Sequence, residues 1–206
     1  MLGDLSAKYE SNSDPGAISD GWGDAGGKSY GAHQYSSATG VVYDFVAWLV
    51  RQGYGPADDL LQSSNSTFDD TWRGIAAQDP EGFLAMQHLF TRGVYYDPAV
   101  KALSEAGFNA DRHSCAMQEV IYSRAVQYGP SLIVEMFESA AQALGNPDLS
   151  YIDDAAFDHD MIRAVYIDVC MTEEWTSSSP ALRAGLYARF ESECTDALAM
   201  LDAEVV

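Results

Sequence analysis

Three carboxylates near the start of the chain, Glu10, Asp20 and Asp24, have the types and spacing that acid and base chemistry requires. Asp20 follows Glu10 by 10 residues and Asp24 by 14, and six of the 17 glycines fall between Gly16 and Gly31. Glycine lets a ligand approach the backbone closely, at an entropy cost that a purely structural loop has little reason to bear. The stretch is therefore predicted to be a loop or hairpin that faces a substrate, with carboxylates available to donate and accept protons.

Glu10 is the first choice for the proton donor. Gly3 to Glu10 is predicted to form one short helix with Leu5 on its inner face, ending before Pro15 and Gly16. Glu10 then lies in the last turn, where the helix dipole disfavours a negative charge. This position and partial burial are expected to raise the pKa of the Glu10 carboxyl and to keep it protonated near neutral pH, as a general acid requires.

Two stretches of the sequence resemble known families. Glu-Ser at Glu10, Ile-Ser at Ile18 and the later SYGxxQ motif resemble the active-site segment of the lysozyme superfamily, in which a catalytic Glu ends a helix and a small β-hairpin follows. The form GDxGGxSYGxxQ, at Gly23 to Gln34, most resembles lysozyme-like domains of phage tails and of contractile secretion-system spike proteins. Residues 83–130, with YDPAV and YSRAVQYGP, are similar to the middle of the chitosanases of glycoside hydrolase family 46.

The resemblance implies a mainly α, lysozyme-like fold with two lobes and a small β-hairpin next to the active site. Because the sequence has no internal repeat and no low-complexity linker, residues 1–206 are predicted to be a single lysozyme- or chitosanase-like catalytic domain. Apolar periodicity predicts helices over residues 38–52, 111–128, 154–174 and 180–201.

The predicted helices also carry expectations about individual side chains. Ser36 or Ser37 is expected to cap the helix over 38–52, and Asp97 to cap a later one in the Asp-Pro order. The helix over 111–128 is expected to be the most buried. Arg124 on it is predicted to pair with an acid such as Glu10 or Glu119, because a lone buried arginine is costly.

The resemblance further implies a peptidoglycan hydrolase, a muramidase that cleaves β-1,4 bonds after N-acetylmuramic acid. Glycoside hydrolysis needs one carboxyl to protonate the leaving oxygen and a second negative group to activate water. We assign the first role to Glu10 and the second to Asp24, which matches the tail and spike motif better than Asp20 does. A hairpin acid facing the helix end leaves room for a water, which predicts inversion and a carboxyl separation of roughly 6.5–9.5 Å.

Other residues of the glycine-rich stretch are expected to bind the glycan. Trp22 is predicted to stack on a sugar ring, and Asp20 is retained both as a binding residue and as the alternative second carboxylate. Residues expected to line the floor of the cleft are Ser29, Tyr30 and Gln34. His33 is left out of the catalytic set, because a histidine in a hairpin is usually structural.

Three other functions stay open at this point. A chitosanase shares the fold and both carboxylates, a lytic transglycosylase needs only Glu10 and leaves anhydromuramic ends, and a wall-binding module of a phage tail or spike needs no catalysis. The implied partners are peptidoglycan strands, a phage tail or secretion spike, and an inhibitor or immunity protein. Because the N-terminus lacks a secretory signal, the protein is expected to reach the cell wall or periplasm by delivery, or to be part of a virion.

Composition narrows the classes of function. The net charge of −20, from 31 acids against 11 Lys and Arg, argues against a nucleic-acid partner, because phosphate binding needs clustered cations. The same charge weakly favours a cationic polymer such as chitosan. No window approaches the ~18 apolar residues of a membrane span. Cys115, Cys170 and Cys194 lack metal-site spacing, so neither metal nor cofactor is expected and buried free thiols are predicted.

Overall fold

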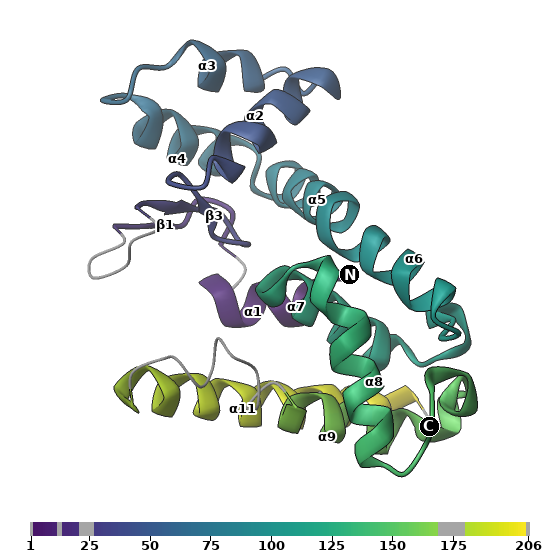
Figure 1. Ribbon diagram of the computed structural model, residues 1–206. Coiled ribbons are helices and arrows are strands. Elements are labelled where there is room, and N and C mark those ends of the chain that lie inside the picture. Colours follow the sequence, from purple (N-terminus) through teal and green to yellow (C-terminus); the bar gives the residue numbers. More distant parts are fainter. Residues whose placement is uncertain (1, 12–13, 21–26, 169–179, 205–206) are drawn as a thin grey trace. The chain divides into compact units, whose positions relative to one another are not determined.

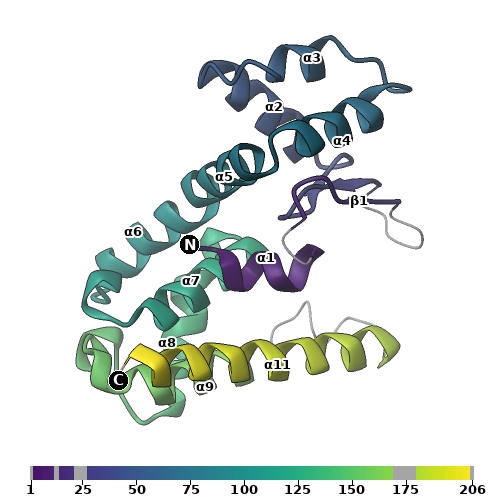
Figure 2. The same ribbon diagram turned by 180° about the vertical axis from the view of Figure 1, so that it is seen from behind.

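The computed structural model describes residues 2–11, 14–20, 27–168 and 180–204. Figure 1 and, from behind, Figure 2 show helices and one small sheet, which confirms the predicted mainly α fold class. The chain divides into two compact units, which we call the sheet unit, residues 6–92, and the helical unit, residues 1–5 with 93–206. None of the described helices combines the length and the apolar character needed to cross a membrane.

The small sheet holds three strands, one more than the predicted hairpin. They are antiparallel in the order β1 (Ile18–Ser19), β2 (Ser29–Tyr30), β3 (Tyr35–Ser36), so that Tyr30 pairs with both neighbours. The turn between β2 and β3 begins at Gly31, with φ 77°, and ends at Gln34, with φ 50°. Gln34 is the one non-glycine residue with positive φ in the described part of the chain, which marks this turn as closely constrained.

Four helices of the sheet unit surround an aromatic core. They are α2 (Val41–Arg51), α3 (Ala57–Gln62), α4 (Phe68–Gln78) and α5 (Pro80–Thr91). Side chains of the sheet and of these helices form one buried cluster that includes Tyr30, Tyr35, Phe45, Leu49, Trp72, Phe83 and Phe90. Each of these side chains contributes about 1.5–3 kcal/mol when fully buried, so the short strands are held chiefly by the helices behind them.

The start of α2 differs from the prediction. Neither Ser36 nor Ser37 caps it: Gly40 precedes the helix with φ 86° and no side-chain cap bond. The Ser36 hydroxyl instead accepts the N–H of Thr39 at 3.2 Å. Because Gly40 adopts a left-handed conformation that other residues reach only at a cost, the backbone itself turns the chain into the helix.

Helix α1 (Asp4–Ser11) begins in the helical unit and ends in the sheet unit. Leu5 is 5% exposed, as expected for the inner face, and Glu10 lies in the last turn, as predicted. A helix of eight residues is marginal by itself in water, so contacts to the rest of the chain must hold it.

The helical unit is built around α7 (Cys115–Tyr128), which packs against four other helices among the described residues of the unit. These are α6 (Asp97–Glu105), α8 (Ile133–Ala143), α9 (Asp158–Asp168) and α11 (Pro180–Glu204), joined in part by the 3-10 turns η2 (Ala110–Arg112), η3 (Pro130–Leu132), η4 (Leu149–Ile152) and η5 (Ala155–Phe157). Nine of the 14 residues of α7 are buried, in line with the prediction of a buried helix. The helix begins later than predicted because Ser114 caps it, its hydroxyl accepting the N–H of Met117 at 3.0 Å.

Asp97 does not cap a helix. The chain passes from α5 through a π-helical turn, η1 (Arg92–Tyr96), into α6 without leaving a helical conformation, and Tyr96 before Asp97 has φ −73° and ψ −53°. Pro98, which has no N–H to donate, follows directly after this π-helical turn, where the helical hydrogen-bond pattern changes.

Arg124 was predicted to pair with an acid such as Glu10 or Glu119, but its partner is Glu193, and the Glu10 side chain lies outside the described residues. The Arg124 Nη2 donates to Glu193 of α11 at 2.6 Å, and both side chains are fully buried. The Ser123 hydroxyl donates to the same carboxylate, and the guanidinium lies 4.7 Å from the ring of Tyr166 and 5.0 Å from that of Phe190. The sequence indicated correctly that this arginine needs an acid, but that acid lies 69 residues away.

The prediction of buried thiols is wrong for one cysteine. Cys115 is exposed at the start of α7, and Cys194 is half-buried; both are free thiols. Burial raises the pKa of the Cys194 thiol, which lowers its reactivity. Cys170 lies outside the described residues.

The buried ion pair of Arg124 and Glu193 is predicted to be important for stability. Glu193→Ala leaves the Arg124 charge buried without its carboxylate, so we expect the free energy of unfolding to fall by about 3–5 kcal/mol. Urea unfolding measures the loss. Glu191→Ala, an exposed position on the same helix, is the matched control and should change stability by less than about 0.5 kcal/mol. A loss below about 1 kcal/mol for Glu193→Ala would contradict the assigned pairing.

Candidate functional site

The predicted site residues that the structure describes lie on or next to α1 and the sheet, within the sheet unit. Glu10 falls in the last turn of α1, and both α1 from Ser6 onward and the sheet belong to the sheet unit. The Glu10 side chain, Trp22 and Asp24 lie outside what the structure describes. The described residues form the framework that holds α1 and the two ends of the glycine-rich stretch.

The carbonyl of Pro15 is the fixed point at the start of the stretch. It accepts the Trp72 Nε1–H at 2.9 Å and the Gln87 Nε2–H at 3.0 Å. The same Gln87 amide accepts the N–H of Ala32 through Oε1 at 2.8 Å, and Gln87 is fully buried. One side chain of α5 thus joins the two ends of the stretch, residues 15 and 32.

Gly31 is required by this contact. A Cβ at position 31 would lie 2.4 Å from the Gln87 Oε1 and 3.0 Å from the Trp72 ring, and Gly31 has φ 77°. The Gly31 N–H also donates to the carbonyl of Ala17 at 2.8 Å. The glycine of the SYGxxQ motif therefore allows the backbone to lie directly against a buried amide.

The side chains of Tyr30 and Gln34 both make hydrogen bonds within the protein that stabilise the sheet and its turn. Tyr30 is 5% exposed among Phe68 and Trp72, and its hydroxyl donates to Asp69 at 2.8 Å. Burial, followed by this hydrogen bond, raises the pKa of Tyr30 far above its usual value. Gln34 donates its side-chain amide to the carbonyl of Gly31 at 2.9 Å and so closes its own turn.

Asp69, at the start of α4, holds the far end of the stretch and was missed by the sequence analysis. It accepts the Lys28 ammonium at 2.5 Å as well as the Tyr30 hydroxyl. The bond from Lys28 lowers the pKa of the Asp69 carboxyl and raises that of Lys28. Only its place beside Asp70 in a first helical turn was visible in the sequence, and it predicts a helix start rather than a contact.

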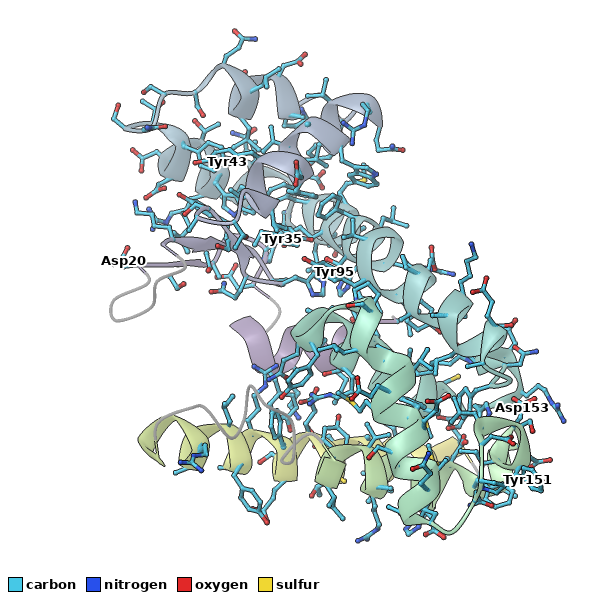
Figure 3. All side chains as sticks on the ribbon, in the orientation of Figure 1. Asp20, Tyr35, Tyr43, Tyr95, Tyr151 and Asp153 are labelled. Atoms are coloured by element: carbon cyan, nitrogen blue, oxygen red, sulfur yellow. The ribbon has the colours of Figure 1, made fainter. Side chains whose placement is uncertain are left out.

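Asp20 and Ser29 differ in exposure. Asp20, labelled in Figure 3, is exposed just after β1, and its negative charge contributes to the raised pKa of Lys28. Ser29 is half-buried on β2 opposite Ser19. Asp20 is therefore accessible to solvent and close enough to Lys28 to raise its pKa.

His33 is a buried structural residue. Its Nε2 lies 3.2 Å from the Nδ1 of His88, and both rings are nearly inaccessible to solvent. Burial, and then the neighbouring imidazole, lower the pKa of His33 to about 3, so it stays neutral at physiological pH. Tyr35, also labelled in Figure 3, lies beside this pair and donates to the carbonyl of Gln87 at 2.8 Å.

The first turn of α1 is held from α7. Both oxygens of the Glu119 carboxylate accept backbone N–H groups, from Gly3 at 2.9 Å and from Leu5 at 3.2 Å. Glu119 is 4% exposed, and this burial raises its pKa to about 7 against the lowering effect of the two N–H groups. Gly3 has φ 98°, and a Cβ there would lie 2.7 Å from the ring of Tyr122.

No metal centre is formed by the side chains that the structure describes: no group of three or more His, Cys, Asp and Glu residues among them is arranged to hold an ion.

Comparison with known proteins assigns the chain to a family. A family model described as type VI secretion system spike protein VgrG3-like, C-terminal, matches residues 2–194. The chain belongs to this family. The match covers Glu10, the whole glycine-rich stretch, Asp69 and Glu119. The matched span of this chain thus contains the residues described above that hold α1 and the sheet in place.

A curated relative agrees with the family. The chain is 35% identical over 129 residues to the type VI secretion system spike protein VgrG3 of Vibrio cholerae serotype O1 (strain ATCC 39315 / El Tor Inaba N16961). The aligned stretch covers 62% of this chain and 12% of that protein, so the chain corresponds to a small part of the relative. The predicted link to spike proteins is confirmed at the level of the family.

The raised pKa of Glu119 predicts how the free energy of unfolding depends on pH. The folded-state pKa of about 7 lies above the ordinary 4.5, so the folded protein binds the Glu119 proton more tightly than the unfolded chain does. The resulting stability is fully present below about 4.5 and is lost as the pH rises to about 7. Relative to Glu119→Gln, the wild-type free energy of unfolding should therefore fall by roughly 2 kcal/mol between pH 5 and 7.5.

Urea unfolding of both proteins at several pH values measures this difference. The comparison with Glu119→Gln cancels the titration of the many other acids. A difference that stays constant across the range would show that the Glu119 carboxyl titrates normally in the folded protein.

Proposed function

We propose that this chain is a peptidoglycan hydrolase of the muramidase type, which cleaves β-1,4 glycosidic bonds with Glu10 as general acid. The arrangement that supports it most is Glu10 in the last turn of α1, followed in the same unit by a sheet that carries the SYGxxQ motif. The negative end of the helix dipole favours a protonated carboxyl at that place. We treat the two units as a single catalytic domain, residues 1–206.

The reaction needs two proton transfers. Glu10 donates its proton to the glycosidic oxygen as the bond to the anomeric carbon breaks, and the leaving sugar departs as an alcohol. Asp24 accepts a proton from a water that attacks the anomeric carbon from the opposite face, which inverts its configuration. The carboxyl groups are expected to lie roughly 6.5–9.5 Å apart to leave room for that water.

The framework supplies the positioning that this chemistry needs. Gln87, Trp72 and Asp69 hold the stretch at its two ends, residues 15 and 28–32, and the proposed base lies between these ends in the sequence. Asp20, Trp22 and Ser29 are the proposed sugar-binding residues, together with the backbone near Gly31. Tyr30 and Gln34 support the site through their contacts to Asp69 and Gly31.

The family membership suggests how the enzyme reaches its substrate. The relative in Vibrio cholerae is a spike protein of a type VI secretion system. We propose that this domain is likewise delivered with a secretion spike to the wall of a target cell, acts there on glycan strands, and is countered by an immunity protein. A phage-tail context, which the sequence also allowed, has less support than the spike.

A second candidate, a chitosanase, is favoured by one observation. The net charge of −20 attracts a cationic polymer and repels the carboxylates of wall peptides. A lytic transglycosylase and a wall-binding module without catalysis are the remaining outcomes, and product analysis separates all four.

The first test uses Glu10→Gln. Purified peptidoglycan is incubated with wild type or variant, and soluble products are identified by mass spectrometry, with chitosan alongside. We expect wild type to release muropeptides with reducing muramic ends and Glu10→Gln to lose at least about 10²-fold in rate, the usual share of a general acid. Glu138→Gln, an exposed residue of α8, is the matched control and should behave as wild type.

Each other result has a defined meaning. Anhydro ends indicate a transglycosylase, and cleavage of chitosan alone indicates a chitosanase. If wild type releases nothing from either polymer but still sediments with peptidoglycan, the domain is a binding module and the catalytic proposal fails.

A separate prediction concerns the second carboxylate. We expect Asp24→Asn to lower kcat by at least about 10²-fold, and Asp20→Asn, whose carboxylate is exposed beside Lys28, to change kcat by less than about tenfold. Steady-state kinetics on soluble glycan chains measures both. The reverse order of effects would make Asp20 the base, and full activity of both variants would exclude a second carboxylate and favour a transglycosylase.

A further inference from the structure

The carboxylate of Glu119 occupies an unusual place for a buried acid. Its two oxygens accept the N–H groups of Gly3 and Leu5, at the N-terminal turn of α1. These donors have no partners within the helix, because the first N–H groups of any α-helix point out of its end. A side chain 114 to 116 residues away thus provides what a local cap usually provides.

The local sequence leaves α1 dependent on that contact. Gly3 precedes the helix and has no side chain with which to cap it, and its φ of 98° is one that most residues avoid. The helix has eight residues, and its described buried side chains are Leu5 and Ser6, so little apolar surface holds it in place. Two hydrogen bonds to backbone N–H groups are a large share of the contacts that hold so short an element.

The same helix carries Glu10. Leu5 and Glu10 are five residues apart, about 8 Å along the helix axis. A tilt of α1 by roughly 10° about Leu5 would move Glu10 by more than about 1 Å. A displacement of that size at a reacting group lowers the rate by up to about 10²-fold, because proton transfer depends on a short and aligned contact.

We propose that Glu119 is a positioning residue for catalysis: by binding the first turn of α1 it sets where Glu10 presents its proton. The role of Glu10 in this inference rests on the proposed function, whereas the placement of α1 by Glu119 does not. Glu119 itself touches no reacting atom, and its contribution is to keep the acid-bearing helix in one orientation.

The test compares two identical substitutions. Glu119→Gln keeps the shape of the side chain but replaces one accepting oxygen by an NH2 group that faces an N–H. Glu204→Gln is the control, because the Glu204 carboxylate likewise accepts two backbone N–H groups, those of Cys115 at 2.9 Å and Ala116 at 2.8 Å, at the start of α7. Both variants replace a carboxylate oxygen that accepts a backbone N–H group, but only in Glu119→Gln does that group belong to the start of α1.

Two readouts are measured on each protein: amide hydrogen exchange in α1 and α7, and kcat and KM on soluble glycan chains. For Glu119→Gln we expect exchange at Gly3 and Leu5 to rise about tenfold or more, kcat to fall at least about tenfold, and KM to change little. For Glu204→Gln we expect faster exchange at Cys115 and Ala116 only, with kcat within about twofold of wild type. If Glu119→Gln fails to fold, Glu119→Asp, which withdraws the charge by one methylene, replaces it.

The outcomes separate this inference from the proposed function. If the α1 amides of Glu119→Gln exchange at the wild-type rate, the inference is overturned whatever the activity. An unchanged kcat in this variant also overturns it. An equal loss of kcat in Glu204→Gln also overturns it, because the effect would then reflect general destabilisation. If wild type cleaves neither peptidoglycan nor chitosan, the proposed function fails, and the exchange data alone decide whether Glu119 holds α1.

Discussion

A polypeptide rich in glycine has few side chains with which to hold itself in place, and the sheet unit is arranged around that constraint. The segment from Pro15 to Ala32 is held by side chains that come from elsewhere, above all by the fully buried amide of Gln87. A buried primary amide is costly unless its donor and acceptor are both satisfied. Here the carbonyl of Pro15 and the N–H of Ala32 satisfy them, so the same two bonds stabilise the amide and fix the loop.

The helical unit uses carboxylates in the same way. Glu119 binds the start of α1, Glu204 the start of α7, and Asp158 accepts the Ser114 N–H while it contacts His113 at 2.6 Å. In each case a side chain from a distant part of the chain satisfies backbone groups that a helix or turn leaves open. The many acids of this chain thus do more than keep its surface solvated, because several of them accept backbone N–H groups.

Local signals predicted the elements, and distant contacts escaped prediction. Apolar periodicity and the order of glycine and proline predicted the last-turn position of Glu10 and a buried α7, and together with the resemblance to lysozyme-like domains they predicted the mainly α fold. The partner of Arg124 was assigned to the wrong acid, because a sequence states that a buried cation needs a carboxylate but not which one. The roles of Gln87 and Asp69 had no local signature, since their partners lie 39 to 72 residues away. For Asp97, the Asp-Pro rule was outweighed by a π turn that carries one helix into the next.

The way the ends of the glycine-rich stretch are held restricts how this sequence can vary. Trp72 and Gln87 bind backbone groups of residues 15 and 32, so several side chains at these two positions are compatible with the same hydrogen bonds. Lys28 and Tyr30 bind Asp69 through their side chains, and position 31 has no room for a Cβ beside Gln87. Substitutions are therefore expected to accumulate at positions 15 and 32 sooner than at positions 28, 30 and 31.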